Sequence, residues 1–290
     1  MRGQRPESPD SAQQLLLALG QLVDQALDRI KYQRARVELA MALQRHMLPP
    51  HLPELPGLRL AARYTPSRDG LDVGGDWYDA FVMSDGALGL AIGDVQGHDV
   101  EAIAFMGQVR TSLRAIAQAT NDTREVLGQA NDLLISMGCD LFATCCFLRF
   151  DPMTRDLTVS RAGHVPMVWA TAGGGSGIAL DSGGPPLGIA SGEKYPVTHR
   201  RLTEAGVLVL LTDGVVEGPH YPMEAGLAEV ANLVRRGFDA DPDVLANAVV
   251  KVADRTGHRD DAAVLVVRYD GPSEPVRHDP SEPARPSDAH

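Results

Sequence analysis

The chain has 290 residues, 44% of them hydrophobic, so it can bury a sizeable core and is expected to be globular. Its formal net charge of −11 argues against a nucleic-acid partner, because binding to phosphate backbones relies on a basic face. The three cysteines lack the number and spacing of a disulfide framework or a zinc site, so we expect Cys139, Cys145 and Cys146 to be buried small hydrophobes.

The N-terminal segment MRGQRPESPD lacks the basic-then-apolar layout of a secretion signal. No apolar run approaches the roughly 18 residues needed to cross a bilayer. We therefore expect a cytoplasmic protein that makes no membrane contact, with residues 1–10 disordered.

A single long helix is predicted over residues 11–47, because this stretch holds no proline and one glycine, and Pro49 and Pro50 stop it. Steps of four and three residues, the period of a helical seam, link Leu19, Val23, Ala26, Ile30, Gln33, Val37, Ala40, Gln44 and Met47. At about 1.5 Å per residue the helix reaches about 50 Å, more than one domain face requires. We therefore favour a signalling helix that forms a homodimer through residues 11–47, over a helix packed on its own domain.

Short apolar stretches follow, punctuated by glycine, aspartate and proline, and they are typical of strands. They are LRLAARY from Leu58, ALGLAIGDV from Ala87 and FATCCFLRF from Phe142. Apolar residues at helical spacing predict two helices, over 100–119 and 123–137, that cover a sheet.

The second half contains turn signals at AGGGSG and GGPPLGI, then the apolar run VLVLL from Val207, which indicates a fully buried strand. Helices are predicted over 223–236 and 241–255, and AAVLVVRY from Ala262 closes the domain as a strand. Without regular alternation of strand and helix, this order favours an α+β fold with a sheet-on-sheet core over a doubly wound parallel sheet. Residues 271–290 have the composition of a disordered tail.

Acidic residues follow apolar stretches in four motifs. The motifs are VGGDWYD with Asp76, AIGDVQGHD with Asp94, LLTDGVVEG with Asp213, and GHRDDAAVL with Asp260 and Asp261. Any one of these aspartates alone reads as a turn former or a helix N-cap. Together they could converge at one edge of the sheets, where their repulsion calls for hard divalent cations such as Mg²⁺ or Mn²⁺.

These motifs resemble the metal-dependent PPM (PP2C-like) phosphatases, specifically their bacterial SpoIIE/RsbU-like branch, over about residues 39–269. The markers, in the order of the family, are LQRHMLPP, VGGDWYDAF, GDVQGHD, MGQVRTSLRA, LFAT, RAGHVP, GGPPLGI, LLTDGVVEG and RDDAAVLVV. The resemblance implies a PP2C-like sandwich of two antiparallel sheets flanked by helices (αββα) over residues 49–270, joined to the linker helix at 11–48.

The resemblance also implies two bound divalent cations, Mn²⁺ or Mg²⁺, with a metal-bound water as the nucleophile and no phospho-enzyme. It places Asp76 and Asp94 between or beside the metals, with the carbonyl of Val95 completing one coordination sphere. Asp213 and Asp260 are expected to hold the other metal side, and Asp261 to orient Asp260.

The chain departs from the eukaryotic members of the family at several positions. Gln96 stands where those members have a candidate general-acid histidine, and His98 lies two residues further on. Arg63 and Arg68 are candidates for binding the substrate phosphate, and only their position in the sequence suggests this role. Asp99 is interpreted as an N-cap.

Four further residues of these motifs are expected to be structural. His164 should stabilise its loop by a hydrogen bond, and Asp79, three residues after Asp76 along a strand, should point to the opposite face. Trp77 and Tyr78 are interpreted as packing residues.

The function expected from this resemblance is a protein serine/threonine phosphatase acting on a phosphorylated regulatory protein, an anti-sigma-factor antagonist. The alternative is a catalytically weak PPM-like scaffold that acts through its N-terminal helix. A third possibility is a phosphatase for a small metabolite, which would need a closed pocket.

Overall fold

The computed structural model describes residues 9–66, 74–97, 100–257 and 260–272. Arg68, His98 and Asp99 lie outside the described residues, as do most of the predicted disordered ends. The helices are α1 (Pro9–Met47), α2 (Val100–Ala117), α3 (Thr123–Ser136), α4 (Asp213–Val216), α5 (Met223–Arg236), α6 (Pro242–Val250) and α7 (Ala253–Thr256). The strands are β1 (Leu58–Thr65), β2 (Trp77–Val82), β3 (Leu88–Val95), β4 (Ala143–Phe150), β5 (Asp156–Ala162), β6 (Val168–Thr171), β7 (Ser176–Ile178), β8 (Val197–Arg201), β9 (Gly206–Leu211) and β10 (Ala262–Tyr269).

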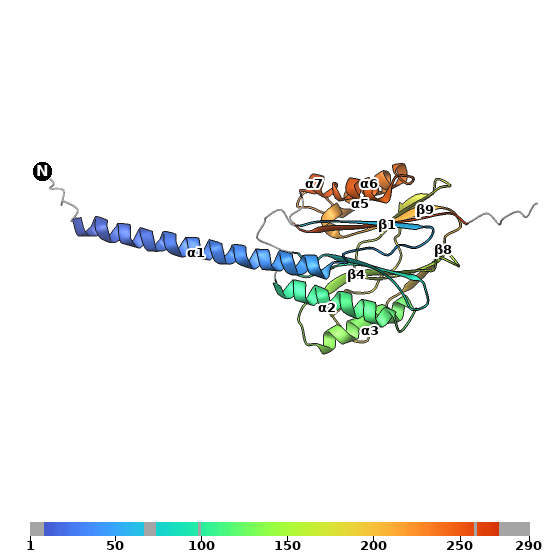
Figure 1. Ribbon diagram of the computed structural model, residues 1–290, viewed down its shortest axis with the longest axis horizontal. Coiled ribbons are helices and arrows are strands. Elements are labelled where there is room, and N and C mark those ends of the chain that lie inside the picture. The colour runs from blue at the N-terminus through green and yellow to red at the C-terminus, as the bar shows by residue number, and fades with distance from the viewer. Residues whose placement is uncertain (1–8, 67–73, 98–99, 258–259, 273–290) are drawn as a thin grey trace, which may run out of the picture.

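The strands form two antiparallel five-stranded sheets that face each other (Figure 1). We call the sheet with strand order β1-β10-β9-β6-β7 the first sheet, and the one with order β2-β3-β4-β5-β8 the second sheet. Helices α5 and α6 cover the outer face of the first sheet, and α2 and α3 cover that of the second. The predicted αββα sandwich with a preceding helix is therefore confirmed.

Three apolar layers hold these elements together. Because successive strand residues point to opposite faces, Leu208 of β9 packs between the sheets whereas its neighbour Val209 packs against the outer helices. On the other side, Phe147 of β4 and Leu127 of α3 belong to one apolar cluster between the second sheet and its helices. A sheet covered on both faces explains why β9 and β10 read as continuous apolar runs, as predicted for VLVLL.

The predicted helix over 241–255 is wrong in one respect, because the structure divides it into α6 and α7. Val252 N donates to Val249 O and Asp254 N donates to Lys251 O, so the chain tightens into i to i−3 hydrogen bonds between the two helices. This tightening brings Val252 and Ala253 into the core. Neither proline nor glycine interrupts the sequence there, so no local signal marks the break.

Helix α1 extends away from the sandwich and is 39 residues long, about 58 Å at 1.5 Å per residue (Figure 1). Its C-terminal end contacts the body, where Arg110 Nε of α2 donates to Met47 O at 2.8 Å. Further out, the predicted seam residues Leu19, Val23 and Ile30 are about half exposed. Within the described ranges, no helix is both long and apolar enough to cross a membrane.

Candidate metal centre

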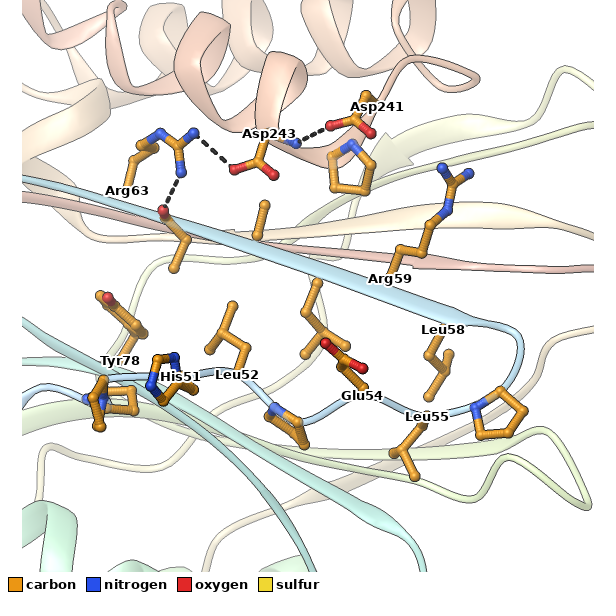
Figure 2. Close-up of a pocket in the computed structure, with 18 residues that line it drawn as sticks. His51, Leu52, Glu54, Leu55, Leu58, Arg59, Arg63, Tyr78, Asp241 and Asp243 are labelled. Atoms are coloured by element: carbon orange, nitrogen blue, oxygen red, sulfur yellow. Dashed lines mark hydrogen bonds and ion pairs between the residues drawn. The ribbon is translucent and has the colours of Figure 1, made fainter.

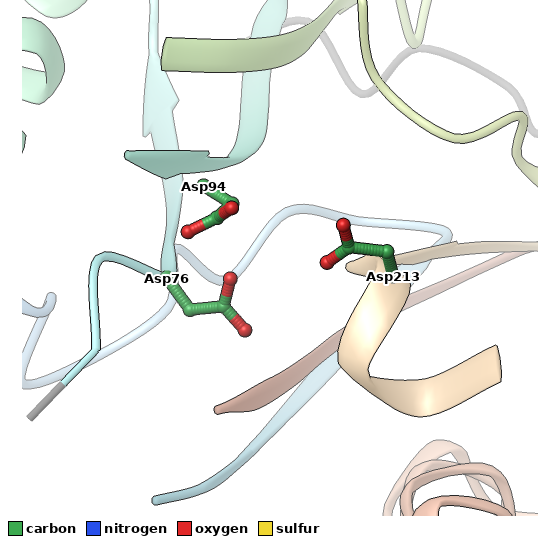
Figure 3. Close-up of side chains that lie close together, drawn as sticks. All are labelled: Asp76, Asp94 and Asp213. Atoms are coloured by element: carbon green, nitrogen blue, oxygen red, sulfur yellow. The ribbon is translucent and has the colours of Figure 1, made fainter. Parts of the chain in front are cut away.

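Three aspartates from three separate segments meet at one end of the sandwich. Asp76 directly precedes β2, Asp94 lies near the end of β3, and Asp213 begins α4 after β9. Each offers a carboxylate oxygen, and these oxygens all lie within 4.8 Å of one another (Figure 3). Since β3 and β9 belong to different sheets, the cluster spans both halves of the sandwich.

Asp76 is held by a hydroxyl that comes from the opposite sheet. Thr212 Oγ1 donates to Asp76 Oδ2 at 2.7 Å, and Thr212 Oγ1 also accepts the N–H of Ala263 at 2.9 Å. The buried Thr212 therefore fixes the orientation of Asp76 relative to β9 and β10. The sequence analysis did not identify Thr212, since only its position just before Asp213 could have suggested it.

Glycines allow the segments around the cluster to approach each other closely. A Cβ on Gly75 would lie 2.4 Å from the carbonyl oxygen of Val95, and one on Gly74 would lie 1.8 Å from Asp261 Oδ2. A Cβ on Gly214 would lie 1.9 Å from the carbonyl oxygen of Asp261. Larger residues at these three positions would push the acidic segments apart.

Asp260 and Asp261 have different surroundings. Asp261 is buried and accepts a hydrogen bond from the hydroxyl of Tyr64, a residue that the sequence analysis did not single out. Asp260 is exposed, lies outside the group of three, and accepts the N–H of Asp261 at 2.8 Å through its Oδ1. The expected ligand Asp260 thus lies beside the cluster and not within it.

Burial and mutual repulsion disfavour the charged forms of the clustered carboxylates. Burial, followed by the charges of Asp213, Asp260 and Asp261, raises the pKa of Asp94 to about 8. Burial and the neighbouring carboxylates also raise the pKa of Asp76 well above its ordinary value. The pKa of Asp213 is raised by burial and by Asp260.

This donor set fits hard divalent cations. The three carboxylates supply oxygen ligands, and positive charge between them would offset the burial and the repulsion that raise their pKa values. Asp94 and Asp213 are only half-buried, so the cluster opens toward the surface.

Two other residues considered in the sequence have their contacts outside this cluster. Arg63 donates from Nη2 to Asp243 at 2.7 Å and from Nε to Asn247 at 2.6 Å, so its guanidinium is turned toward α6. Gln96 is exposed, and its main-chain N–H donates to Phe142 O.

The residues expected to be structural have structural contacts. His164 is buried between Thr144 Oγ1 at 2.9 Å and Leu211 O at 3.1 Å. Trp77 is fully buried in the core against α2, whereas Tyr78 is partly exposed. Among the cysteines, Cys145 and Cys146 are buried and Cys139 is only partly so.

Comparison with known proteins gives a consistent set of similarities. The family described as Stage II sporulation protein E (SpoIIE) matches residues 84–270, a span that contains Asp94, Asp213 and Asp260, whereas Asp76 lies shortly before it. Protein IcfG of Synechocystis sp. is 26% identical over 261 residues, which cover 80% of this chain and 40% of that protein. Phosphoserine phosphatase RsbU of Bacillus subtilis is 23% identical over 185 residues, 63% of this chain and 54% of the relative.

Solved structures show the same fold. The RsbU and RsbW domains of Rv1364c from Mycobacterium tuberculosis align with a TM-score of 0.70 and 32% identity, over 79% of this chain and 64% of that one. The PP2C phosphatase domain of SpoIIE from Bacillus subtilis aligns with a TM-score of 0.62 and 21% identity, over 73% of this chain and 64% of that one. The chain spans about half the length of the curated relatives that it matches.

Proposed function

Because this chain belongs to the SpoIIE family, the bacterial branch of the PPM phosphatases, we propose that it is a metal-dependent protein serine/threonine phosphatase. The observation that carries the proposal is the convergence of Asp76, Asp94 and Asp213, from both sheets, to within 4.8 Å. Like charges brought together at a half-buried site are costly unless cations offset them, so the cluster argues against the scaffold alternative.

We further propose that two divalent cations, Mn²⁺ or Mg²⁺, bind here. The ligands would be the carboxylates of Asp76, Asp94, Asp213 and Asp260, with the carbonyl of Val95. When bound, such a pair supplies positive charge to the phosphate oxygens and lowers the pKa of a water so that it can attack phosphorus.

The residues of the chain itself prepare this site before any cation binds. Thr212 holds one oxygen of Asp76, which leaves the other oxygen available as a ligand. Tyr64 holds Asp261, whose N–H in turn binds the carboxylate of Asp260. In this proposal Asp261 positions Asp260 through the main chain.

The proposed substrate is a phosphoserine or phosphothreonine on a regulatory protein, an anti-sigma-factor antagonist. Two similar proteins, RsbU and RsbP of Bacillus subtilis, are named phosphoserine phosphatases, which supports phosphoserine as the target. The partial exposure of Asp94 and Asp213 also favours a protein substrate over a small metabolite, which would be enclosed. The expected cytoplasmic location stays a prediction.

We also propose that α1 forms the homodimer expected from its seam. Large apolar side chains are exposed along it, among them Leu15, Leu16, Leu19, Leu22, Val23, Leu27 and Ile30. An isolated helix with this much exposed apolar surface is unusual in a soluble domain, and a second copy would bury it. The domain boundaries at residues 48 and 270 remain predictions.

Hydrolysis of p-nitrophenyl phosphate in Mn²⁺, Mg²⁺ and chelator tests the proposed activity. We expect turnover with a divalent cation and none with chelator. Asp94→Asn should lower kcat at least about a hundredfold, beyond the roughly 10- to 100-fold effect of residues that only support a ligand. Asp239→Asn, an exposed carboxylate elsewhere on the surface, is the control and should keep full activity. Metal-independent turnover, or an active Asp94→Asn variant, would contradict the assignment.

A further inference from the structure

A groove of about 1010 Å³ runs along β1, an edge strand of the first sheet (Figure 2). On one side lies the segment 49–56, which contributes Pro49, Pro50, Pro53 and Pro56. On the other side lies the start of α6, with Asp241, Pro242 and Asp243. Figure 2 shows β1 passing between these two rows of side chains.

The outward direction of the main chain of β1 follows from its register. Thr212 N donates to the carbonyl of Ala263, so the main-chain groups of Ala263 point toward β9. This direction alternates along a strand, so the neighbours of Ala263 in β10, and every second residue from them, point their main-chain groups toward β1. The β1 residues opposite those alternate residues are Arg59, Ala61, Arg63 and Thr65. The residues between them turn their main-chain N–H and C=O groups away from the sheet, into the groove, and these are Leu58, Leu60, Ala62 and Tyr64.

Two hydrogen bonds agree with this direction and use part of the edge. Leu58 N donates to Leu55 O at 3.0 Å, and Arg63 Nη1 donates to Ala62 O at 2.7 Å. Within the described residues, the N–H and C=O of Leu60 and the N–H of Ala62 have no main-chain partner on this side. The flanking segment leaves them unpaired, since its four prolines have no N–H to donate in a ladder.

One end of the groove adjoins the acidic cluster. Arg63 and Tyr78 line this end, and the residue after Arg63 is Tyr64, whose hydroxyl binds Asp261. Tyr78 lies two residues after Asp76 along β2. An extended chain lying along β1 would therefore lead from the far end of the groove to the candidate metal site.

The far end of the groove carries a cation, Arg59, that the acidic residues of the groove do not pair with. Arg59 is exposed, and in the described part of the chain its guanidinium makes no ion pair or hydrogen bond. It stands five residues before Tyr64, about 17 Å along a strand. An acidic side chain of the occupant, about five residues from the residue that enters the metal site, would complement it.

We propose that this groove binds the protein substrate by strand addition, with an extended phosphoserine-bearing segment pairing with Leu60 and Ala62. The pairing presents the phosphoserine to the acidic cluster and an acidic residue to Arg59. This inference rests on the proposed phosphatase function. The competing interpretation is that these features protect an edge strand, because prolines and an exposed charge beside such a strand also prevent unwanted pairing with other chains.

Leu60→Pro tests the pairing, since it removes an outward N–H without touching a hydrogen bond to β10, and Leu60→Ala is its matched control. The probe is a synthetic phosphoserine peptide of alternating valine and threonine, with a glutamate about five residues to either side. We expect Leu60→Pro to lower kcat/KM on the peptide about tenfold, and Leu60→Ala to lower it less than about threefold. With p-nitrophenyl phosphate both variants should stay within about twofold of the wild type. Equal effects of the two substitutions on the peptide would overturn the proposal.

A second measurement needs no variant that could misfold. Two isomers of the peptide, N-methylated on opposite sets of alternate residues, should differ in kcat/KM, because only one set turns its N–H groups toward β1. Equal rates for the two isomers would exclude strand pairing. Arg59→Glu should weaken turnover of the glutamate peptide and favour a lysine version, and a variant that treats both alike would remove the role of Arg59.

These outcomes separate the inference from the function on which it rests. If p-nitrophenyl phosphate is not hydrolysed in Mn²⁺, the phosphatase proposal itself fails. If it is hydrolysed while the two methylated isomers react equally, only the docking proposal fails. A second copy of this chain could also occupy the groove, and sedimentation of Leu60→Pro tests this. A change from dimer to monomer in this variant would assign the groove to the second copy and overturn substrate docking.

Discussion

Asp79 has a structural role although it lies only three residues from Asp76. It is fully buried, and Arg114 of α2 donates to both of its oxygens, at 2.6 and 3.1 Å, with Arg110 at 3.7 Å. A buried carboxylate held in this way joins β2 to α2, and removing it leaves the guanidinium of Arg114 without its carboxylate partner and removes the ion pair with Arg110.

Asp79→Ala should therefore lower the free energy of unfolding by about 2–3 kcal/mol, a value reduced because Arg114 is partly exposed. Asp85→Ala is the matched control, since Asp85 also accepts two hydrogen bonds from one arginine, Arg149, but is 30% exposed. Its loss should cost no more than about 1 kcal/mol. Urea unfolding measures both, and equal costs would show that burial does not set the value of Asp79.

His164 predicts a pH dependence of stability. Burial lowers its pKa to about 3, and its Nε2–H donates to Leu211 O while Nδ1 accepts from Thr144 Oγ1. The unfolded chain takes up the proton below its ordinary pKa of about 6.5, whereas the folded chain does not until about pH 3. Stability contributed by the neutral ring is thus complete above about pH 6.5 and is lost as the pH falls.

Between about pH 7.5 and 5.5 the wild type should lose about 1.4 kcal/mol more unfolding free energy than His164→Gln, which cannot take up this proton. Urea unfolding of both proteins at the two pH values measures the difference. Since every other titrating group is common to the two proteins, parallel losses would show that His164 is not held neutral.

At the scale of elements, α1 carries more apolar surface than its own domain buries. Its end is anchored, because Arg110 binds Met47 O, and Val37 packs against the core. The rest of its apolar surface stays exposed in a single copy. The proposed pairing would bury that surface and would place the anchored ends of two helices beside two copies of α2.

Replacing Leu19, Val23 and Ile30 with glutamate should convert a dimer into a monomer, because the like charges would face each other across the seam. Sedimentation velocity measures the change. The control places glutamate at Gln14, Gln21 and Gln25, which lie on the opposite side of the helix and add the same charge. A wild type that is monomeric at all concentrations, or a control as disruptive as the seam variant, would contradict the proposal.

At the scale of the whole molecule, the acidic cluster is the place where the two sheets are held together by chemistry and not only by apolar packing. Asp94 belongs to the second sheet and Asp213 follows the first. Cations shared between them would link the halves of the sandwich, whereas without cations the same charges push the halves apart.

Mn²⁺ at about a hundred times its dissociation constant should add about 2.7 kcal/mol of stability and raise Tm by roughly 5–10 °C. Asp94→Asn should lose most of this increase. In chelator, however, the variant should melt at or above the wild-type Tm, because one repelling carboxylate is gone. Thermal unfolding of both proteins, with Mn²⁺ and with chelator, measures these differences. A variant that is less stable than the wild type in chelator would show that the carboxylates do not repel one another.

The sequence alone determined the elements, because each apolar period is a local property. The helix 223–236 and the strand AAVLVVRY were predicted with their observed bounds, and the order of strands and helices was enough for a sandwich. Glycine and aspartate at the ends of apolar runs marked Asp76, Asp94 and Asp213 for the same reason. The break between α6 and α7 escaped, since it arises from burial of Val252 and Ala253.

Only the tertiary structure decided which side chains meet, because contacts between segments far apart in the chain leave no local trace. Thr212 on Asp76 joins residues 136 positions apart, and Tyr64 on Asp261 joins residues 197 apart. The same holds for Arg63, which the sequence offered for phosphate and which the fold turns toward Asp243. The open edge of β1 likewise exists only because the sheet ends there and a proline-rich segment lies beside it without pairing.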